Sequence, residues 1–146
     1  MIYLDSSAFV KRYLEEIGTD VVRSIISTPG VIASSKLTYP EMLSAFMRKL
    51  RAGKIERRRV HGVIERFERD WHYVLVLEFH NGLLQIIKTL IEKYPLKAAD
   101  AIHLASALWL KHSAKTDVTF VASDSNLLKA AQGENLHILN PLDGTK

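Results

Sequence analysis

A short apolar run that ends in serine or aspartate and is followed by helical periodicity occurs three times in this chain. The runs cover residues 2–4, 31–35 and 118–123. Runs this short, rich in β-forming residues and stopped by polar turn residues, are typical of buried strands. Strands that alternate with helices form a mostly parallel sheet that carries helices on both faces. The pattern therefore predicts an α/β fold.

The remaining elements follow from apolar spacing and from glycine and proline breaks. Two further apolar runs predict strands at residues 73–77 and 136–139. A helix is expected to open at Thr38 and end at Gly53, and the helix after Gly53 should pack against it as a helical hairpin. Helical spacing predicts the other helices at residues 8–14, 21–26, 55–71, 81–93, 97–111 and 127–131.

Size and composition limit the class of protein. The 146 residues suffice for one domain with its own core, so we expect a single domain over residues 1–146. No apolar run approaches the roughly 18 residues of a membrane span, and no signal peptide is evident, so we expect a cytoplasmic protein without membrane contact. The absence of cysteine excludes disulfides and thiolate zinc sites. The net charge of +4 is compatible with a polyanionic partner such as RNA.

Four acidic residues occupy equivalent places in the predicted fold. Asp5 and Asp124 follow strands, and Glu41 and Asp100 lie in the first turns of helices. Each has an ordinary structural explanation. Asp5 and Asp124 can cap the helices that follow, Glu41 can complete a capping box with Thr38, and Asp100 can complement the positive end of its helix. For any single acid, such an explanation is commoner than an active site.

Taken together, the four acids predict a metal site. The turns after parallel strands lie on one edge of the sheet, so the acids can converge on one crevice. Carboxylates about 4 Å apart repel by about 4 kcal/mol at an effective dielectric constant near 20, and a bound cation relieves that repulsion. Oxygen ligands select Mg²⁺ or Mn²⁺, which leaves positions open for phosphate oxygens. Such an ion polarises a phosphodiester and lowers the pKa of a bound water for in-line attack.

Four segments that contain these acids resemble the signature segments of the PIN-domain ribonucleases, and within that family the VapC toxins of type II toxin–antitoxin systems. They are residues 2–7, 37–43, 97–105 and 120–124, of which 100–105 is the most specific. The resemblance spans the chain and implies a three-layer α/β/α sandwich that hydrolyses RNA with Mg²⁺ or Mn²⁺. It also implies a homodimer and a cognate antitoxin partner. The implied catalytic and metal-binding residues are Asp5, Glu41, Asp100 and Asp124.

Hydroxyl and imidazole side chains stand beside the acids. Ser6 or Ser7 resembles the hydroxyl residue that follows the first acid in this family, where it orients a ligand, although either can also be a plain helix cap. Ser123 has the same two interpretations. His103 lies three residues after Asp100, where it either hydrogen-bonds the acids or is simply a packed histidine.

Basic residues near the acids are candidates for binding RNA. Lys11, Arg12 and Lys97 flank the acids in sequence, and we expect them to contact the RNA at the cleaved bond. A dense basic block surrounds Gly53 and consists of Arg48, Lys49, Arg51, Lys54, Arg57, Arg58 and Arg59. It is compatible with phosphate contacts, with a solvated helix surface or with a partner-binding face. The family resemblance implies dimer or antitoxin contacts for this hairpin.

The leading hypothesis is thus a metal-dependent endoribonuclease toxin. Its alternatives are a PIN-fold RNA-binding or regulatory module without turnover, and an RNA-processing nuclease that is not a toxin. A phosphatase of the haloacid dehalogenase type would carry a second acid two residues after Asp5, where Ser7 stands. A receiver domain would need a lysine at the end of its last strand, which this chain lacks.

Overall fold

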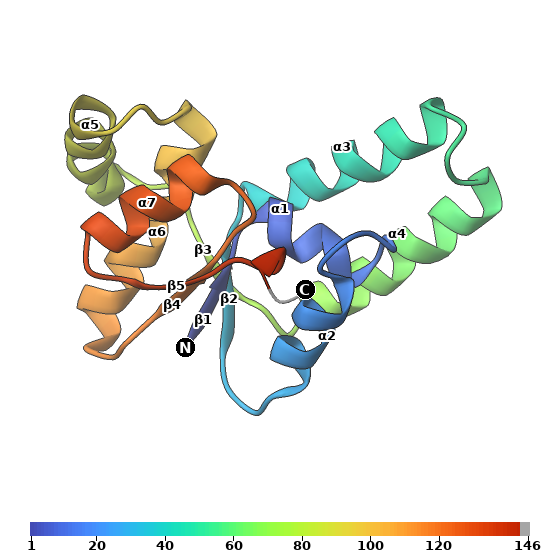
Figure 1. The fold of residues 1–146 in the computed structure, drawn as a ribbon, viewed down its shortest axis with the longest axis horizontal. Helices are drawn as coiled ribbons and strands as arrows, with labels where there is room; N and C mark the ends of the chain where they lie inside the picture. Colours follow the sequence, from blue (N-terminus) through green and yellow to red (C-terminus); the bar gives the residue numbers. More distant parts are fainter. Residues whose placement is uncertain (144–146) are drawn as a thin grey trace.

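The computed structural model describes residues 1–143, in which five short strands form one sheet that is parallel throughout (Figure 1). The strands are β1 (Ile2–Leu4), β2 (Ile32–Ser35), β3 (Leu75–Leu77), β4 (Thr119–Val121) and β5 (His137–Leu139). Their order is β3-β2-β1-β4-β5. The first strand of the chain therefore lies at the centre, where Ile2 is in register with Ile32 on one side and Thr119 on the other.

Helices cover both faces of this sheet, which confirms the predicted α/β/α arrangement. One layer contains α1 (Ser6–Phe9), a 3₁₀ turn at Val10–Arg12, α2 (Thr19–Ser27), α3 (Thr38–Arg51) and α4 (Arg57–Trp71). The other contains a 3₁₀ turn at Asn81–Leu83, α5 (Leu84–Lys93), α6 (Ala98–Ala114) and α7 (Ser125–Gly133). Figure 1 shows the two layers on opposite sides of the sheet. No helix over residues 1–143 is long and apolar enough to cross a membrane.

Alternating side chains of the central strands supply two separate cores. Tyr3 and Phe120 face the α5–α7 layer, and their rings stack with centroids 5.3 Å apart. Leu4 and Val121, the next residue of each strand, face the α1–α4 layer. Successive strand residues point to opposite faces, so a strand covered on both sides is apolar throughout. This explains why the apolar residues of β1 and β4 are consecutive rather than alternating.

Aromatic rings hold the α3–α4 hairpin against the sheet. Phe67 of α4 is fully buried and has five ring neighbours at centroid distances between 5.5 and 5.9 Å. These neighbours are Phe9, Tyr13, Tyr39, Phe46 and Trp71. The end of the hairpin that carries Gly53 extends beyond the sheet (Figure 1). The hairpin is thus fixed at its base and exposed at its tip.

The predicted elements are all present, but two local predictions were wrong. The segment at 8–14 is a short α-helix that begins at Ser6 and continues as a 3₁₀ turn. The capping box expected at the start of α3 does not form. The helix begins after Leu37 without a side-chain cap, because the Thr38 hydroxyl bonds Ser34 Oγ at 2.7 Å and the Glu41 carboxylate is used elsewhere.

Candidate active site

The four acids lie at the carboxyl edge of the sheet. Asp5 directly follows β1, Asp124 follows β4, Glu41 lies in the first turn of the helix after β2, and Asp100 lies in the first turn of α6. They are close enough to influence one another. The negative charge of Asp100 raises the pKa of Asp5, and the charges of Asp124 and Glu41 raise the pKa of Asp100. The structure therefore brings all four into one electrostatically coupled group.

Asp5 is the most buried of the four, with 3% of its surface exposed. Burial raises its pKa from 3.8 to about 6, against the opposing effects of His103 and of two hydrogen bonds. Its Oδ1 accepts from the Ser7 hydroxyl at 2.7 Å and from the backbone N–H of Ala8 at 3.1 Å. Asp5 is thus the N-cap of α1, which confirms the capping role that the sequence suggested. Aspartate side chains are rarely buried this deeply, and capping a helix does not require it. Within residues 1–143, the second carboxylate oxygen of Asp5, Oδ2, receives no hydrogen bond.

Asp100 and Asp124 are more open to solvent. The pKa of Asp100, a half-buried residue, is raised mainly by burial and then by Asp124, while His103 and Lys97 lower it. Asp124 is exposed, and its Oδ1 accepts from the backbone N–H of Leu127 at 2.9 Å, which caps α7. The capping explanation is therefore correct for Asp124 as well, with Oδ2 left without a donor among the described residues.

A buried histidine holds Glu41. His103 is 1% exposed, and its Nε2 lies 2.6 Å from Glu41 Oε1. Its Nδ1 lies 2.8 Å from the hydroxyl of Tyr3, a fully buried residue of β1. Because a carboxylate only accepts, the Nε2–H of His103 donates to Glu41, while Nδ1 shares a hydrogen bond with the Tyr3 hydroxyl. His103 is both packed and bonded to an acid, so the two interpretations offered for it hold together.

Serine side chains join the strand ends beneath the acids. The Ser7 hydroxyl, which donates to Asp5, also accepts from the backbone N–H of Ser123 at 3.1 Å. The hydroxyl of Ser123 is buried and has no hydrogen-bond partner within residues 1–143. A buried polar atom without a partner costs about 1–3 kcal/mol, so this hydroxyl marks a place where a water or polar ligand belongs. Ser6 lies on the wall of the groove described next.

A groove of about 430 Å³ runs along α3 from Glu41, the one of the four acids that lines it. Ser6, Ser7, Glu41, Ser44 and Arg48 lie along it. Residues at i, i+3 and i+7 share one helical face, which places Arg48 on the same side of α3 as Glu41. Arg48 therefore belongs both to the basic block around Gly53 and to this groove. The seven-residue spacing between Glu41 and Arg48 is the feature of the sequence that predicts this shared face.

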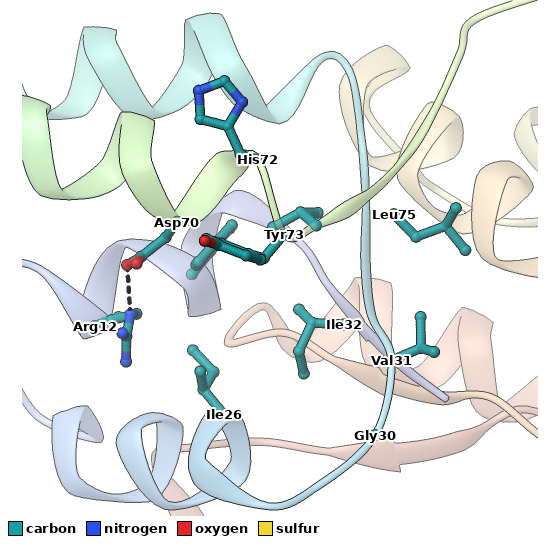
Figure 2. A pocket seen from close by; sticks show the side chains of 11 residues that line it. Arg12, Ile26, Gly30, Val31, Ile32, Asp70, His72, Tyr73 and Leu75 are labelled. Atoms are coloured by element: carbon teal, nitrogen blue, oxygen red, sulfur yellow. Dashed lines mark hydrogen bonds and ion pairs between the residues drawn. The ribbon is translucent and has the colours of Figure 1, made fainter.

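Two of the three basic residues expected to contact RNA are placed elsewhere. Lys11 is 7% exposed and its Nζ pairs with Glu16 at 3.3 Å. Arg12 forms an ion pair in which its Nε lies 2.9 Å from Asp70 Oδ2. Both residues line a cavity at the amino edge of the sheet, opposite to the acids (Figure 2). The side chains of Lys11 and Arg12 are thus both engaged in ion pairs within the protein, and their contact with RNA stays a prediction. Lys97 is exposed and lowers the pKa of Asp100, so it remains a candidate.

The donor set suits a hydrated divalent cation rather than a closed metal cage. Within residues 1–143, no three acidic, histidine or cysteine side chains are close enough to hold an ion on their own. Mg²⁺ characteristically takes one or two carboxylates and keeps several waters. Oxygen-only donors, raised pKa values at Asp5 and Asp100 and an unpartnered hydroxyl at Ser123 all fit an ion bound in that way.

Comparison with known proteins agrees with this architecture. A family model described as the PIN domain matches residues 2–133. Ribonuclease VapC45 of Mycobacterium tuberculosis is 30% identical over 108 residues, which cover 74% of this chain and 75% of the relative. Ribonuclease VapC46 of the same species is 33% identical over 106 residues, 73% of each protein. A toxin–antitoxin complex from Klebsiella pneumoniae contains a chain that superposes with a TM-score of 0.68 at 14% identity, over 97% of this chain and 98% of that one. By family match and by fold, this chain belongs to the PIN domain family.

Proposed function

We propose that this chain is an endoribonuclease that hydrolyses RNA phosphodiester bonds with Mg²⁺ or Mn²⁺, and that it is the toxin of a toxin–antitoxin pair. The observation that carries the proposal is the buried carboxyl of Asp5, whose pKa is raised to about 6 beside Asp100. A divalent cation is what makes such a pair of carboxylates favourable. The ribonuclease names of the relatives support the reaction, and the toxin–antitoxin complex supports the pairing.

The residues of the site have separate roles in this proposal. Asp5 and Asp100 would hold the metal ion, Glu41 and Asp124 would bind its waters, and the ion would polarise the phosphate and acidify a bound water. Ser7 fixes one oxygen of Asp5, and His103 fixes one oxygen of Glu41. Lys97, which lowers the pKa of Asp100, and Arg48, which lines the groove with Glu41, would contact phosphates near the cleaved bond.

The first test is cleavage of a mixed RNA pool with Mg²⁺, with Mn²⁺ and with EDTA. We expect cleavage with either metal, none with EDTA, and none by Asp100→Asn. Asp20→Asn is the matched control, because Asp20 is an exposed acid in the first turn of α2 as Asp100 is in the first turn of α6. Cleavage that survives Asp100→Asn would contradict the proposed site. RNA retention without cleavage under every condition would instead favour the module without turnover.

A second test removes the hydroxyl that holds the histidine. Tyr3→Phe keeps the ring that stacks on Phe120 but leaves His103 Nδ1 without its hydrogen-bond partner. The imidazole of His103 is then no longer held in position against Glu41. We therefore expect the apparent Mg²⁺ affinity in the cleavage assay to fall about 10-fold. The free energy of unfolding should fall by about 1–2 kcal/mol. Urea denaturation and a Mg²⁺ titration of the cleavage rate would measure the two effects.

Tyr13→Phe provides the control for that test. Its hydroxyl is also lost from a buried ring, but this hydroxyl donates to Asp70, away from the four acids. It should therefore lower stability and leave the Mg²⁺ dependence unchanged. Equal Mg²⁺ dependence in Tyr3→Phe and in the unaltered protein would mean that His103 is merely packed.

The proposal includes a cytoplasmic protein that forms a homodimer and binds a cognate antitoxin. The exposed hairpin around Gly53, with its basic residues, is the surface we assign to these contacts. Co-expression with a neighbouring small antitoxin gene, followed by purification and light scattering, would test both points. Retention of RNA cleavage without growth inhibition in cells would favour an RNA-processing nuclease over a toxin.

A further inference from the structure

A second, mainly apolar cavity of about 680 Å³ opens at the same edge of the sheet as the four acids. Its apolar wall consists of Leu37, Tyr39, Pro40, Trp71, Phe79 and Ile102. We propose that this cavity, which we call the base pocket, binds an unpaired nucleobase of the RNA that the acids cleave. The inference rests on the proposed function and adds a specificity-determining subsite to it.

The base pocket is continuous with the acid site. It shares Leu37 and Pro40 with the groove that contains Glu41 and Arg48. Pro40 directly precedes Glu41 in α3, and Ile102 follows Asp100 by two residues in α6. A nucleotide whose phosphate reaches the acids therefore has the mouth of the pocket within the reach of its own base.

The side chains of the base pocket suit the flat face of a base. Phe79, just beyond β3, is 56% exposed, and no aromatic ring within residues 1–143 packs against it. The rings of Tyr39 and Trp71 lie 5.8 Å apart at 53°, and Tyr39 is held by its hydroxyl, which donates to Glu68 at 2.6 Å. Unstacked RNA bases are commonly bound between aromatic side chains. The volume lies in the range of roughly 300–1,000 Å³ that small ligands occupy.

The rim of the base pocket carries an exposed ion pair. Lys36 Nζ pairs with Glu78 at 3.0 Å, and both side chains are more than 60% exposed. An exposed pair of this kind contributes little to stability, so Lys36 can exchange its partner for a phosphate. An apolar floor with a lysine at its edge matches a nucleotide, which has a flat base and an anionic backbone.

The test is photo-cross-linking of a random-sequence, single-stranded RNA 20-mer that contains 5-iodouridine. Asp100→Asn protein is used so that the RNA stays intact, and the cross-linked peptides are identified by mass spectrometry. We expect cross-links at Tyr39, Trp71 or Phe79. Adding Phe79→Ala should lower the yield at Tyr39 and Trp71 several-fold.

Cleavage kinetics supply the second measurement, and β3 supplies a matched control. Phe79→Ala should lower kcat/KM for the RNA pool about 10-fold, and Phe79→Tyr should restore it, because stacking needs only an aromatic face. Tyr73→Ala should change neither measurement. Tyr73 is 89% exposed and precedes β3, so it lies at the amino edge of the sheet, where it lines the cavity drawn in Figure 2.

The remaining outcomes overturn the inference in distinguishable ways. Metal-dependent cleavage that Phe79→Ala leaves intact, with cross-links only outside the base pocket, would overturn the pocket and keep the nuclease. A change from dimer to monomer in Phe79→Ala, seen by analytical ultracentrifugation without pocket cross-links, would assign the cavity to an interface between copies. Absence of both cleavage and cross-links would overturn the proposed function together with the inference.

Discussion

Asp5→Asn is expected to abolish metal-dependent RNA cleavage and, in the same protein, to stabilise the metal-free fold above pH 6. The loss of cleavage follows because the carboxylate proposed to hold the ion is replaced by a neutral amide. Lewis-acid stabilisation of a phosphoryl transition state is worth several kcal/mol, and each 1.36 kcal/mol is tenfold in rate. Cleavage by Asp5→Asn should therefore fall at least about 100-fold.

The gain in stability follows from the pKa of Asp5. Its folded value of about 6 exceeds the ordinary 3.8, so the folded state binds more protons than the unfolded state between these values. Stability therefore falls as pH rises through this window, and above pH 6 the full penalty of a buried charge remains. Its size is roughly 3 kcal/mol at 1.36 kcal/mol per pKa unit. Asparagine carries no charge and can still accept from Ser7 and Ala8, so it escapes the penalty.

Urea denaturation in EDTA at pH 4 and pH 8 would test this account. The two proteins should differ little at pH 4, and Asp5→Asn should be the more stable at pH 8. Added Mg²⁺ should raise the unfolding midpoint of the unaltered protein and leave that of Asp5→Asn unchanged, because only the former binds the ion in its folded state. A variant that is inactive but less stable at pH 8 would show that Asp5 is needed mainly as a cap.

Phe67→Ala is expected to lower the free energy of unfolding by about 3–5 kcal/mol. The ring is fully buried and contacts five other aromatic rings, so its removal leaves a cavity between α4 and the helices beneath it. Most single domains are stable by only about 5–15 kcal/mol, so much of that stability would be lost. Urea denaturation would measure the change.

Two further variants test whether the loss of stability comes from the buried position of the Phe67 ring. Phe67→Leu should cost less than Phe67→Ala, because leucine fills most of the space. Phe79→Ala removes the same atoms from an exposed position and should change stability little. A loss below about 1 kcal/mol in Phe67→Ala would mean that the hairpin does not depend on this ring for its position.

The strands and helices were predictable because their signals are local. Residues 2–4 and 118–123 are apolar on both faces, as a strand between two helical layers requires, and turn residues mark their ends. The acids were predictable by the same logic, since the turn after each parallel strand must lie at one edge. Asp5 and Asp124 are both helix caps and members of the acid group, so the structural and the functional explanation apply to the same residues.

The wrong predictions concern partners that are distant in sequence. Glu41 pairs with His103, 62 residues away, rather than with the capping-box threonine nearby. The pairing of Arg12 with Asp70, 58 residues away, likewise could not be inferred from the position of Arg12 near Asp5 in the sequence. Sequence spacing fixes which face of one helix a residue occupies, but not which other element that face meets. The base pocket, built from four separate segments, could not be predicted for the same reason.

The position of β1 at the centre of the sheet has a consequence for the order in which the site forms during synthesis. β1 is translated first, but one of its two flanking strands, β4, begins only at residue 119. Until that strand is made, Asp5 follows a strand with one open edge, and Asp124 does not yet exist. Such non-local pairing forms late in folding. A chain released before residue 119 therefore lacks β4, its pairing with β1 and the fourth acid, so on the proposed function incomplete translation products should not cleave RNA.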